Sequence, residues 1–185
     1  MTLTPTASQT VGPYLHLGLT DRGSVARVAG EGIPGERISL IVRVLDGNRT
    51  PVPDAMIELW QADAAGKYRD HASVDPAFRG FGRLATGADG SCTFETIKPG
   101  RVPWKDGRAQ APHINVSVLG RGLLKRLATR IYFAGDPANE EDAVLALVTE
   151  DRRRTLLAHS DSTKPGNWIF EVRLRGEGET VFFDV

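Results

Sequence analysis

The residues with the clearest chemical potential are a histidine and an asparagine two positions apart, His113 and Asn115, in the run APHINVSV. Alternate residues of a β-strand point to the same face, so we expect both side chains to project together. Two histidines at this spacing would supply half of a transition-metal site, whereas an amide is a poor ligand compared with imidazole. The spacing is therefore compatible with the remnant of a metal site, and the plain structural alternative is a strand histidine held by hydrogen bonds.

Two further polar residues lie where strands are expected. Tyr68 ends the run AMIELWQADAAGKY, and tyrosinate is a ligand of ferric iron in haem catalases. Arg130 lies within LATRIYF, where a charge is costly unless it is paired, and by alternation it shares a face with Tyr132. The plain structural alternatives are a half-buried tyrosine with a satisfied hydroxyl and an arginine on a solvated outer face.

Length and composition limit the class of protein. The 185 residues suffice for one domain with a full core, and the formal net charge of zero gives no reason to expect nucleic acid or an anionic membrane as a partner. The first ten residues lack the basic and apolar regions of a signal peptide, and Cys92 has no second cysteine for an intrachain disulfide. We therefore expect a cytoplasmic protein.

Alternating apolar and polar residues separated by turn signals predict the secondary structure. They predict strands over 37–45, 55–61, 83–86, 91–97, 113–119, 127–133, 168–174 and 180–183. Residues 136–160 form the one region rich in helix formers. This order predicts an all-β fold, an antiparallel β-sandwich with a short helical insertion. Residues 1–22 have no period and are predicted to form an extended segment with a turn at Gly12-Pro13.

The chain resembles the intradiol ring-cleavage dioxygenases in several motifs that come in the family's order and cover nearly its whole length. The motifs are GERISLIVRVLDGNRTPVPDAMIELWQADAAGKY, FRGFGRLATGADGSCTFETIKPG, PW followed by APHINVSV, and TRIYFAGD. The opening SQTVGPYLHLG and the ending RGEGETVFFDV resemble the alpha chains of heteromeric members in particular. The fold implied is a β-sandwich with a strand pattern similar to transthyretin.

The resemblance also implies what happened to the metal site. In the family, two tyrosines and two histidines hold ferric iron. Carried over by motif, this chain keeps Tyr68 and His113, but has Val102 and Asn115 where the other two ligands would stand. Gln110 occupies the position of the catalytic chain's arginine. The resemblance thus implies a vestigial site that binds no metal of its own.

The role implied by the resemblance is that of a supporting subunit. Fe(III) would be held by a partner beta chain of the same family, with the active site at the junction between the two chains. Thr10, Gly12, Pro13 and Tyr14 would line the substrate pocket, and Arg130 would act as a catalytic and substrate-binding residue that favours a carboxylated catechol.

The same resemblance implies that residues 1–22 dock on the partner chain and that residues 23–185 form the single β-sandwich domain. Two alternatives remain. One is a self-sufficient dioxygenase that recruits His16 or His71 as a ligand. The other is a non-enzymatic β-sandwich carrier, against which the intact SQTVGPY and TRIYF motifs argue.

Overall fold

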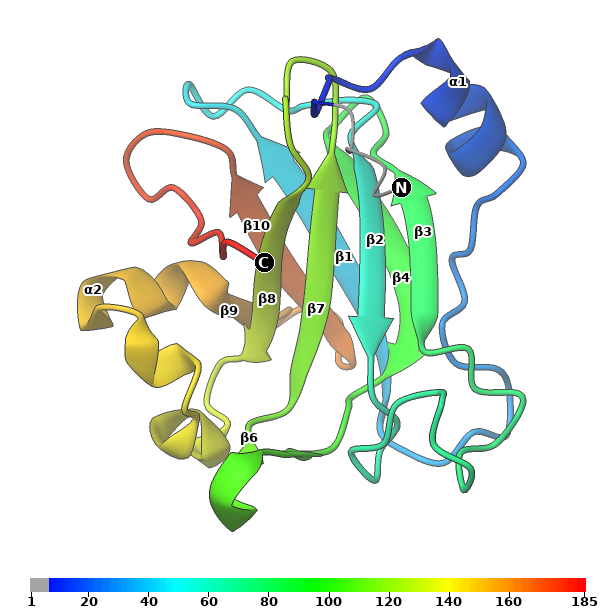
Figure 1. Cartoon of the computed structure of the whole chain (residues 1–185), viewed down its shortest axis with the longest axis vertical. Coiled ribbons are helices and arrows are strands. Elements are labelled where there is room, and N and C mark those ends of the chain that lie inside the picture. The colour runs from blue at the N-terminus through cyan, green and yellow to red at the C-terminus, as the bar shows by residue number, and fades with distance from the viewer. Residues whose placement is uncertain (1–6) are drawn as a thin grey trace, which may run out of the picture.

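The fold is mostly β, with two longer helical regions at its periphery and one short 3-10 turn at Lys105–Gly107 (Figure 1). The computed structural model describes residues 7–185. The strands are β1 (Arg37–Leu45), β2 (Met56–Gln61), β3 (Phe81–Ala85), β4 (Ser91–Ile97), β5 (Val102–Pro103), β6 (Ala109–Gln110), β7 (His113–Leu119), β8 (Leu127–Phe133), β9 (Leu157–Ser160) and β10 (Asn167–Arg173). The helices are α1 (Pro13–Leu15), the π-helical η1 (His16–Asp21), α2 (Glu150–Arg153) and the 3-10 turns η2 (Lys105–Gly107), η3 (Pro137–Glu141), η4 (Leu145–Leu147) and η5 (Arg154–Leu156).

The long strands form where the sequence alternates between apolar and polar residues. In β7, Ile114, Val116 and Val118 are buried in the core, whereas Asn115 and Ser117 on the opposite face are partly exposed. β1, β4, β7 and β8 begin and end at the predicted residues. The strand predicted over 180–183 is wrong, because only Phe183 pairs there, in an isolated bridge to Ala128.

The eight longer strands form one continuous sheet in the order β3-β2-β7-β8-β9-β10-β1-β4. Neighbours are antiparallel except for two parallel pairs, β8 with β9 and β1 with β10. β9 therefore joins two halves that the sequence had suggested as separate layers. Its four residues pair with Tyr132 and Phe133 on one side and with Trp168 and Ile169 on the other.

The sheet curls until its two edge strands, β3 and β4, come close together. Residues 25–28 lie between these edges and bond to both. Val25 N donates to Arg83 O of β3 at 2.7 Å, and Val28 N donates to Glu95 O of β4 at 2.9 Å. Both edges thus gain backbone partners, as in a closed barrel. The predicted all-β class is confirmed, but the architecture is a nearly closed, barrel-like sheet of mixed direction, not clearly an antiparallel sandwich.

The two helical regions differ in part from the sequence prediction. The predicted insertion is present, but it breaks into short turns, and its last residues form β9. The N-terminal segment was predicted to be extended, yet Pro13–Asp21 is helical (Figure 1). Pro13 starts this helix because proline suits the first helical position as well as it suits a turn. Residues 1–6 lie outside the described residues. No helix in residues 7–185 is long and apolar enough to cross a membrane.

A tight glycine contact holds the loop after β2 against the chain that leads into β5. Gly66 has a φ of +77°, and a Cβ there would lie 1.9 Å from the carbonyl oxygen of Arg101. We expect Gly66→Ala to lower the free energy of unfolding by about 3 kcal/mol, through both backbone strain and displacement of the neighbouring loop. Urea denaturation of the purified chain measures this.

The matched control is Gly122→Ala. Gly122 has a similar φ of +84°, but nothing lies within 4 Å of the position that the alanine methyl group would take. This variant should lose only the strain energy, about 1 kcal/mol. Equal losses in the two variants would contradict a specific contact at Gly66.

Candidate functional site

Tyr68, His113 and Asn115 form a hydrogen-bonded triad at the outer face of the sheet. Tyr68 OH lies 3.4 Å from His113 Nε2, and Asn115 Nδ2 donates to Tyr68 OH at 3.1 Å. His113 and Asn115 are the first and third residues of β7, so the pleat places them on one face, as the sequence predicted. Tyr68 reaches them from the loop after β2.

The hydrogen-bond network defines the protonation of the triad. His113 Nδ1 lies 2.8 Å from the backbone carbonyl oxygen of Ala111, so we assign the ring proton to Nδ1. Nε2 then presents a lone pair to Tyr68. The Tyr68 hydroxyl accepts from Asn115 and donates to His113. The Tyr68 hydroxyl and both ring nitrogens of His113 therefore have hydrogen-bond partners.

Burial keeps the two titratable members of the triad neutral. Desolvation raises the pKa of Tyr68, although the hydrogen bond from Asn115 and the charge of Arg130 partly oppose this. Burial lowers the pKa of His113 to about 4, helped by the charge of Arg130 and opposed by the hydrogen bond to Ala111. A neutral phenol and a neutral imidazole thus face each other at neutral pH.

The residues present do not fit the four-ligand ferric site that the sequence motifs imply. Val102 is buried in β5, pairs with Gln110, and carries no donor atom. Asn115 turns its amide nitrogen toward Tyr68, and that nitrogen cannot donate a lone pair to a metal. Among the side chains that the structure describes, no group of three or more histidine, cysteine, aspartate or glutamate residues is arranged to hold a metal ion. Only Tyr68 and His113 keep the chemistry of ligands.

Arg130 lies on β8 directly opposite Asn115 in the register of the sheet. Its Nη1 donates to Gln110 Oε1 at 2.7 Å and lies 3.5 Å from Tyr132 OH. Arg130 and Tyr132 share one face, as alternation predicted. The guanidinium is thus fixed beside the triad, with its positive charge close enough to lower the pKa of both Tyr68 and His113.

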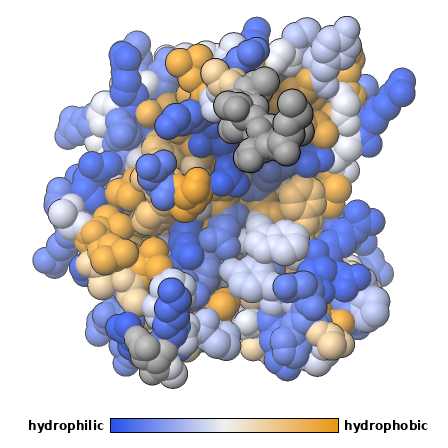
Figure 2. Space-filling view, viewed as in Figure 1, coloured by the Kyte–Doolittle hydropathy of each residue, from blue (hydrophilic) through white to orange (hydrophobic). Residues whose placement is uncertain are grey.

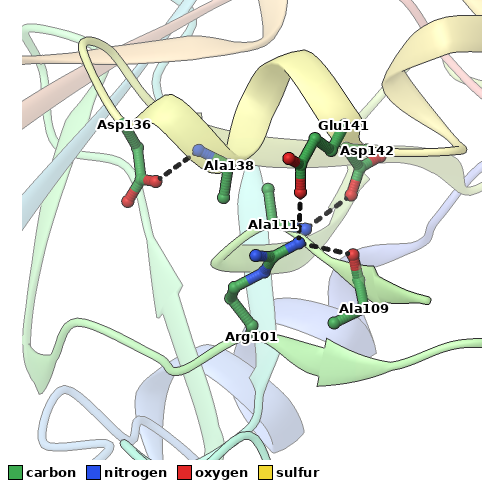
Figure 3. A network of polar contacts seen from close by, with 7 residues as sticks. All are labelled: Arg101, Ala109, Ala111, Asp136, Ala138, Glu141 and Asp142. Atoms are coloured by element: carbon green, nitrogen blue, oxygen red, sulfur yellow. Dashed lines mark hydrogen bonds and ion pairs between the residues drawn. The ribbon is translucent and has the colours of Figure 1, made fainter. Parts of the chain in front are cut away.

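A buried carboxylate, Asp142, anchors the helical insertion to this site. Its Oδ2 accepts from Ala111 N at 2.8 Å, and its Oδ1 accepts from Tyr132 OH at 3.0 Å. Figure 3 shows Asp142 reaching from the insertion to Ala111, next to the exposed pair of Glu141 and Arg101. Asp142 therefore fixes Ala111, two residues before β7, and Tyr132 on the strand that carries Arg130.

The structure places the N-terminal site residues elsewhere. Thr10 Oγ1 accepts from Gly122 N at 2.9 Å, at the turn between β7 and β8. This turn is the opposite end of the hairpin from His113. Pro13 begins α1, Gly12 precedes it, and the Tyr14 side chain is 84% exposed. A single chain therefore does not bring residues 10–14 and the triad into one pocket.

The other histidines have local partners. His16 Nδ1 lies 2.9 Å from Thr20 Oγ1, and His71 Nδ1 lies 3.0 Å from Ser73 Oγ. Among residues 7–185, neither has a hydrogen bond to the triad. His159 is an exposed residue of β9.

Sequence reasoning missed the residues that support the site. Trp60 stacks on Tyr68 with ring centroids 6.1 Å apart and planes 8° from parallel. Its position on the outward face of β2 was visible from alternation, but the stacking partner was not. Tyr132 was noted only as a neighbour of Arg130. Asp142 was not singled out, because nothing local in the sequence reveals its bond to Ala111.

The buried His113 predicts a pH dependence of stability. Its folded pKa, about 4, lies below the ordinary 6.5, so protons bind more tightly to the unfolded chain. The stability it contributes is complete above pH 6.5 and is lost as pH falls toward 4. The loss should be about 2 kcal/mol at pH 5 and about 3 kcal/mol at pH 4. Urea unfolding between pH 7 and pH 4 measures this loss of the free energy of unfolding. In His113→Gln, the part of the loss that comes from His113 should disappear.

The chain is similar to known proteins over most of its length. The model of the dioxygenase family described as "Dioxygenase" matches residues 10–176. The chain is 43% identical to the protocatechuate 3,4-dioxygenase alpha chain of Pseudomonas putida, covering 98% of this chain and 97% of that one. It is 38% identical to the beta chain of the Burkholderia cepacia enzyme, over 89% of this chain and 75% of that one.

A solved structure agrees with these sequence relatives. The dioxygenase domain of a dioxygenase and carbohydrate-binding fusion protein from Streptomyces sp. SirexAA-E superimposes with a TM-score of 0.64 at 27% identity, covering 94% of this chain and 99% of that domain. Near-complete coverage in both directions extends the likeness to the whole β fold and not to a shared motif alone. The chain therefore belongs to the intradiol ring-cleaving dioxygenase family.

Proposed function

We propose that this chain is the alpha subunit of a protocatechuate 3,4-dioxygenase and works beside a beta chain that holds the iron. The enzyme would cleave the ring of 3,4-dihydroxybenzoate with O2 to give 3-carboxy-cis,cis-muconate. The family uses non-haem iron, and Fe(III) in the beta chain would supply the activation of the catechol. This chain would contribute substrate contacts and no metal ligand.

The observation that carries this proposal is a mismatch between family membership and ligand chemistry. The chain has the length and fold of its dioxygenase relatives, yet Val102 and Asn115 leave only Tyr68 and His113 as donors. These two are committed to a hydrogen-bonded triad with Asn115. A complete fold whose own site cannot hold iron is what we expect of a supporting subunit.

Exposed aromatic and apolar residues on this chain favour the binding of a partner chain. Trp60 is 41% exposed on the outer face of β2, beside the triad, and Tyr14 and Leu17 project from the N-terminal helices. Figure 2 shows polar residues along the middle of this face with hydrophobic residues on either side. Large exposed aromatic side chains such as these are enriched at protein interfaces. Residues 10–14 would leave the β7–β8 turn on binding the beta chain and join Arg130 in a pocket that the beta chain completes.

Within that pocket, Arg130 has a specific role. A fixed guanidinium forms strong, charge-assisted hydrogen bonds to a carboxylate, so it would hold the carboxyl group of 3,4-dihydroxybenzoate and orient its hydroxyl groups toward the partner's site. Thr10, Gly12, Pro13 and Tyr14 would form the neighbouring wall. The two alternatives have less support. His16 and His71 bond to local residues, and the relatives of this chain are dioxygenases, not carriers.

The test is iron content with a visible spectrum, for the chain alone and for the chain co-purified with a beta chain. We expect the chain alone to be colourless, with less than about 0.1 iron per chain, because two ligands do not compete with water for ferric iron. The complex should be coloured and should consume O2 with 3,4-dihydroxybenzoate. Stoichiometric iron and turnover in the chain alone would refute the supporting role.

A further inference from the structure

The acceptors that fix Arg130 are both uncharged. Nη1 donates to the amide oxygen of Gln110 at 2.7 Å and approaches the hydroxyl of Tyr132 at 3.5 Å. Gln110 is 5% exposed and Tyr132 is fully buried. Burial raises the pKa of Tyr132 well above its ordinary value, so the phenol stays neutral. Among the side chains and backbone groups that the structure describes, none accepts a hydrogen bond from Nε or Nη2 of Arg130.

The nearest carboxylate on this network is separated from Arg130 by one side chain. Asp142 Oδ1 takes hydrogen bonds from Tyr132 OH and from the backbone N–H groups of Val144 and Leu145, and Oδ2 takes one from Ala111 N. Four hydrogen-bond donors therefore surround the Asp142 carboxylate, and none of them belongs to the Arg130 guanidinium. Among the described residues, no ion pair includes Arg130, so its charge remains uncompensated.

A neutral acceptor differs from a carboxylate in one respect that matters here. Both can hold a guanidinium in one orientation through a short hydrogen bond, such as the one of 2.7 Å that Gln110 accepts. A carboxylate would also neutralise it, and in a partly buried site such an ion pair competes strongly with any further anion. An amide holds the group in place and leaves its charge available.

We propose that Gln110 is a positioning residue that sets the preference of the enzyme for a carboxylated ring, because it orients Arg130 without neutralising it. This inference rests on the proposed contact between Arg130 and the substrate carboxylate. Gln110 itself touches no substrate. Its placement follows from β6, where it pairs with Val102 and leads through Ala111 into β7.

The test compares two substrates on the assembled enzyme, 3,4-dihydroxybenzoate and catechol, which lacks the carboxyl group. Gln110→Glu keeps the acceptor and adds a negative charge. We expect the ratio of kcat/KM for 3,4-dihydroxybenzoate to that for catechol to fall at least about 10-fold, mainly through KM of the carboxylated substrate. Gln110→Met removes the acceptor but not the charge of Arg130, so the ratio should fall less, about 3-fold.

Asn48→Asp is the matched control, since it adds the same charge in an exposed turn far from Arg130 and should leave the ratio unchanged. Iron content and circular dichroism check that each complex is assembled. Equal losses for both substrates in Gln110→Glu would overturn the inference, because a purely structural role lowers both alike.

Arg130→Met, measured alongside, separates this inference from the proposed function. If Arg130→Met lowers the ratio and Gln110→Glu does not, only the role of Gln110 is refuted. If Arg130→Met leaves the ratio unchanged, the contact between Arg130 and the carboxylate is refuted, and the inference fails with it.

Discussion

Replacing Arg130 with methionine is expected to lower kcat/KM for 3,4-dihydroxybenzoate about 100-fold in the assembled enzyme, without loss of iron. A charge-assisted hydrogen bond in a partly buried site contributes up to roughly 3 kcal/mol, and this energy corresponds to about two powers of ten in rate. Methionine keeps the apolar stem of the side chain, so packing on β8 is preserved. Oxygen uptake with initial-rate kinetics measures the effect.

The control for this change is Arg27→Met, which removes an exposed arginine paired with Glu31 far from the triad. It should leave kcat/KM unchanged. A second readout uses the isolated chain. Because the charge of Arg130 lowers the pKa of His113, Arg130→Met should raise that pKa in an NMR titration. Loss of iron together with activity would instead indicate that Arg130 supports assembly.

Replacing Asp142 with alanine is expected to lower the free energy of unfolding of the chain by about 4 kcal/mol. The change leaves a buried phenol and three backbone N–H groups without their acceptor, and each orphaned buried donor costs roughly 1–3 kcal/mol before relaxation. The insertion would also lose its anchor to the start of β7. Urea denaturation at pH 7 gives the value, with circular dichroism as the signal.

Glu141 supplies the matched control, as the neighbouring carboxylate of the same insertion (Figure 3). Its side chain is 73% exposed and pairs with Arg101 at 3.1 Å. Exposed ion pairs contribute about 0–1 kcal/mol, so Glu141→Ala should change stability little. If both variants lost the same small amount, the anchoring role of Asp142 would be wrong.

The strands could be predicted from the sequence because their signal is local. β1 and β7 alternate cleanly and end at turn residues, so their bounds were correct to the residue. β9 was missed, since Leu157–Ser160 follows a run of helix formers and is a strand only through its pairing with β8 and β10. The barrel-like closure was missed for the same reason, because it depends on contacts of residues 25–28 with distant edges.

In the candidate site, too, the features with a local sequence signal could be predicted and those that depend on long-range contacts could not. The shared face of His113 and Asn115 follows from the period of a strand, and the pairing of Arg130 with Tyr132 follows from alternation. The link from Tyr132 to Asp142 joins β8 to an irregular insertion, and sequence spacing carries no information about such a bond. The position of Thr10 at the β7–β8 turn likewise depends on how the N-terminal segment packs.

The parallel pairing of β1 with β10 affects how the chain can fold during synthesis. Ser39 pairs with Asn167 and Leu45 pairs with Arg173, so one side of β1 has no neighbour until the last strand has left the ribosome. Until then, a strand that has neighbours on both sides in the finished sheet presents an open hydrogen-bonding edge. Such long-range closure makes folding slow and leaves nascent chains prone to aggregate.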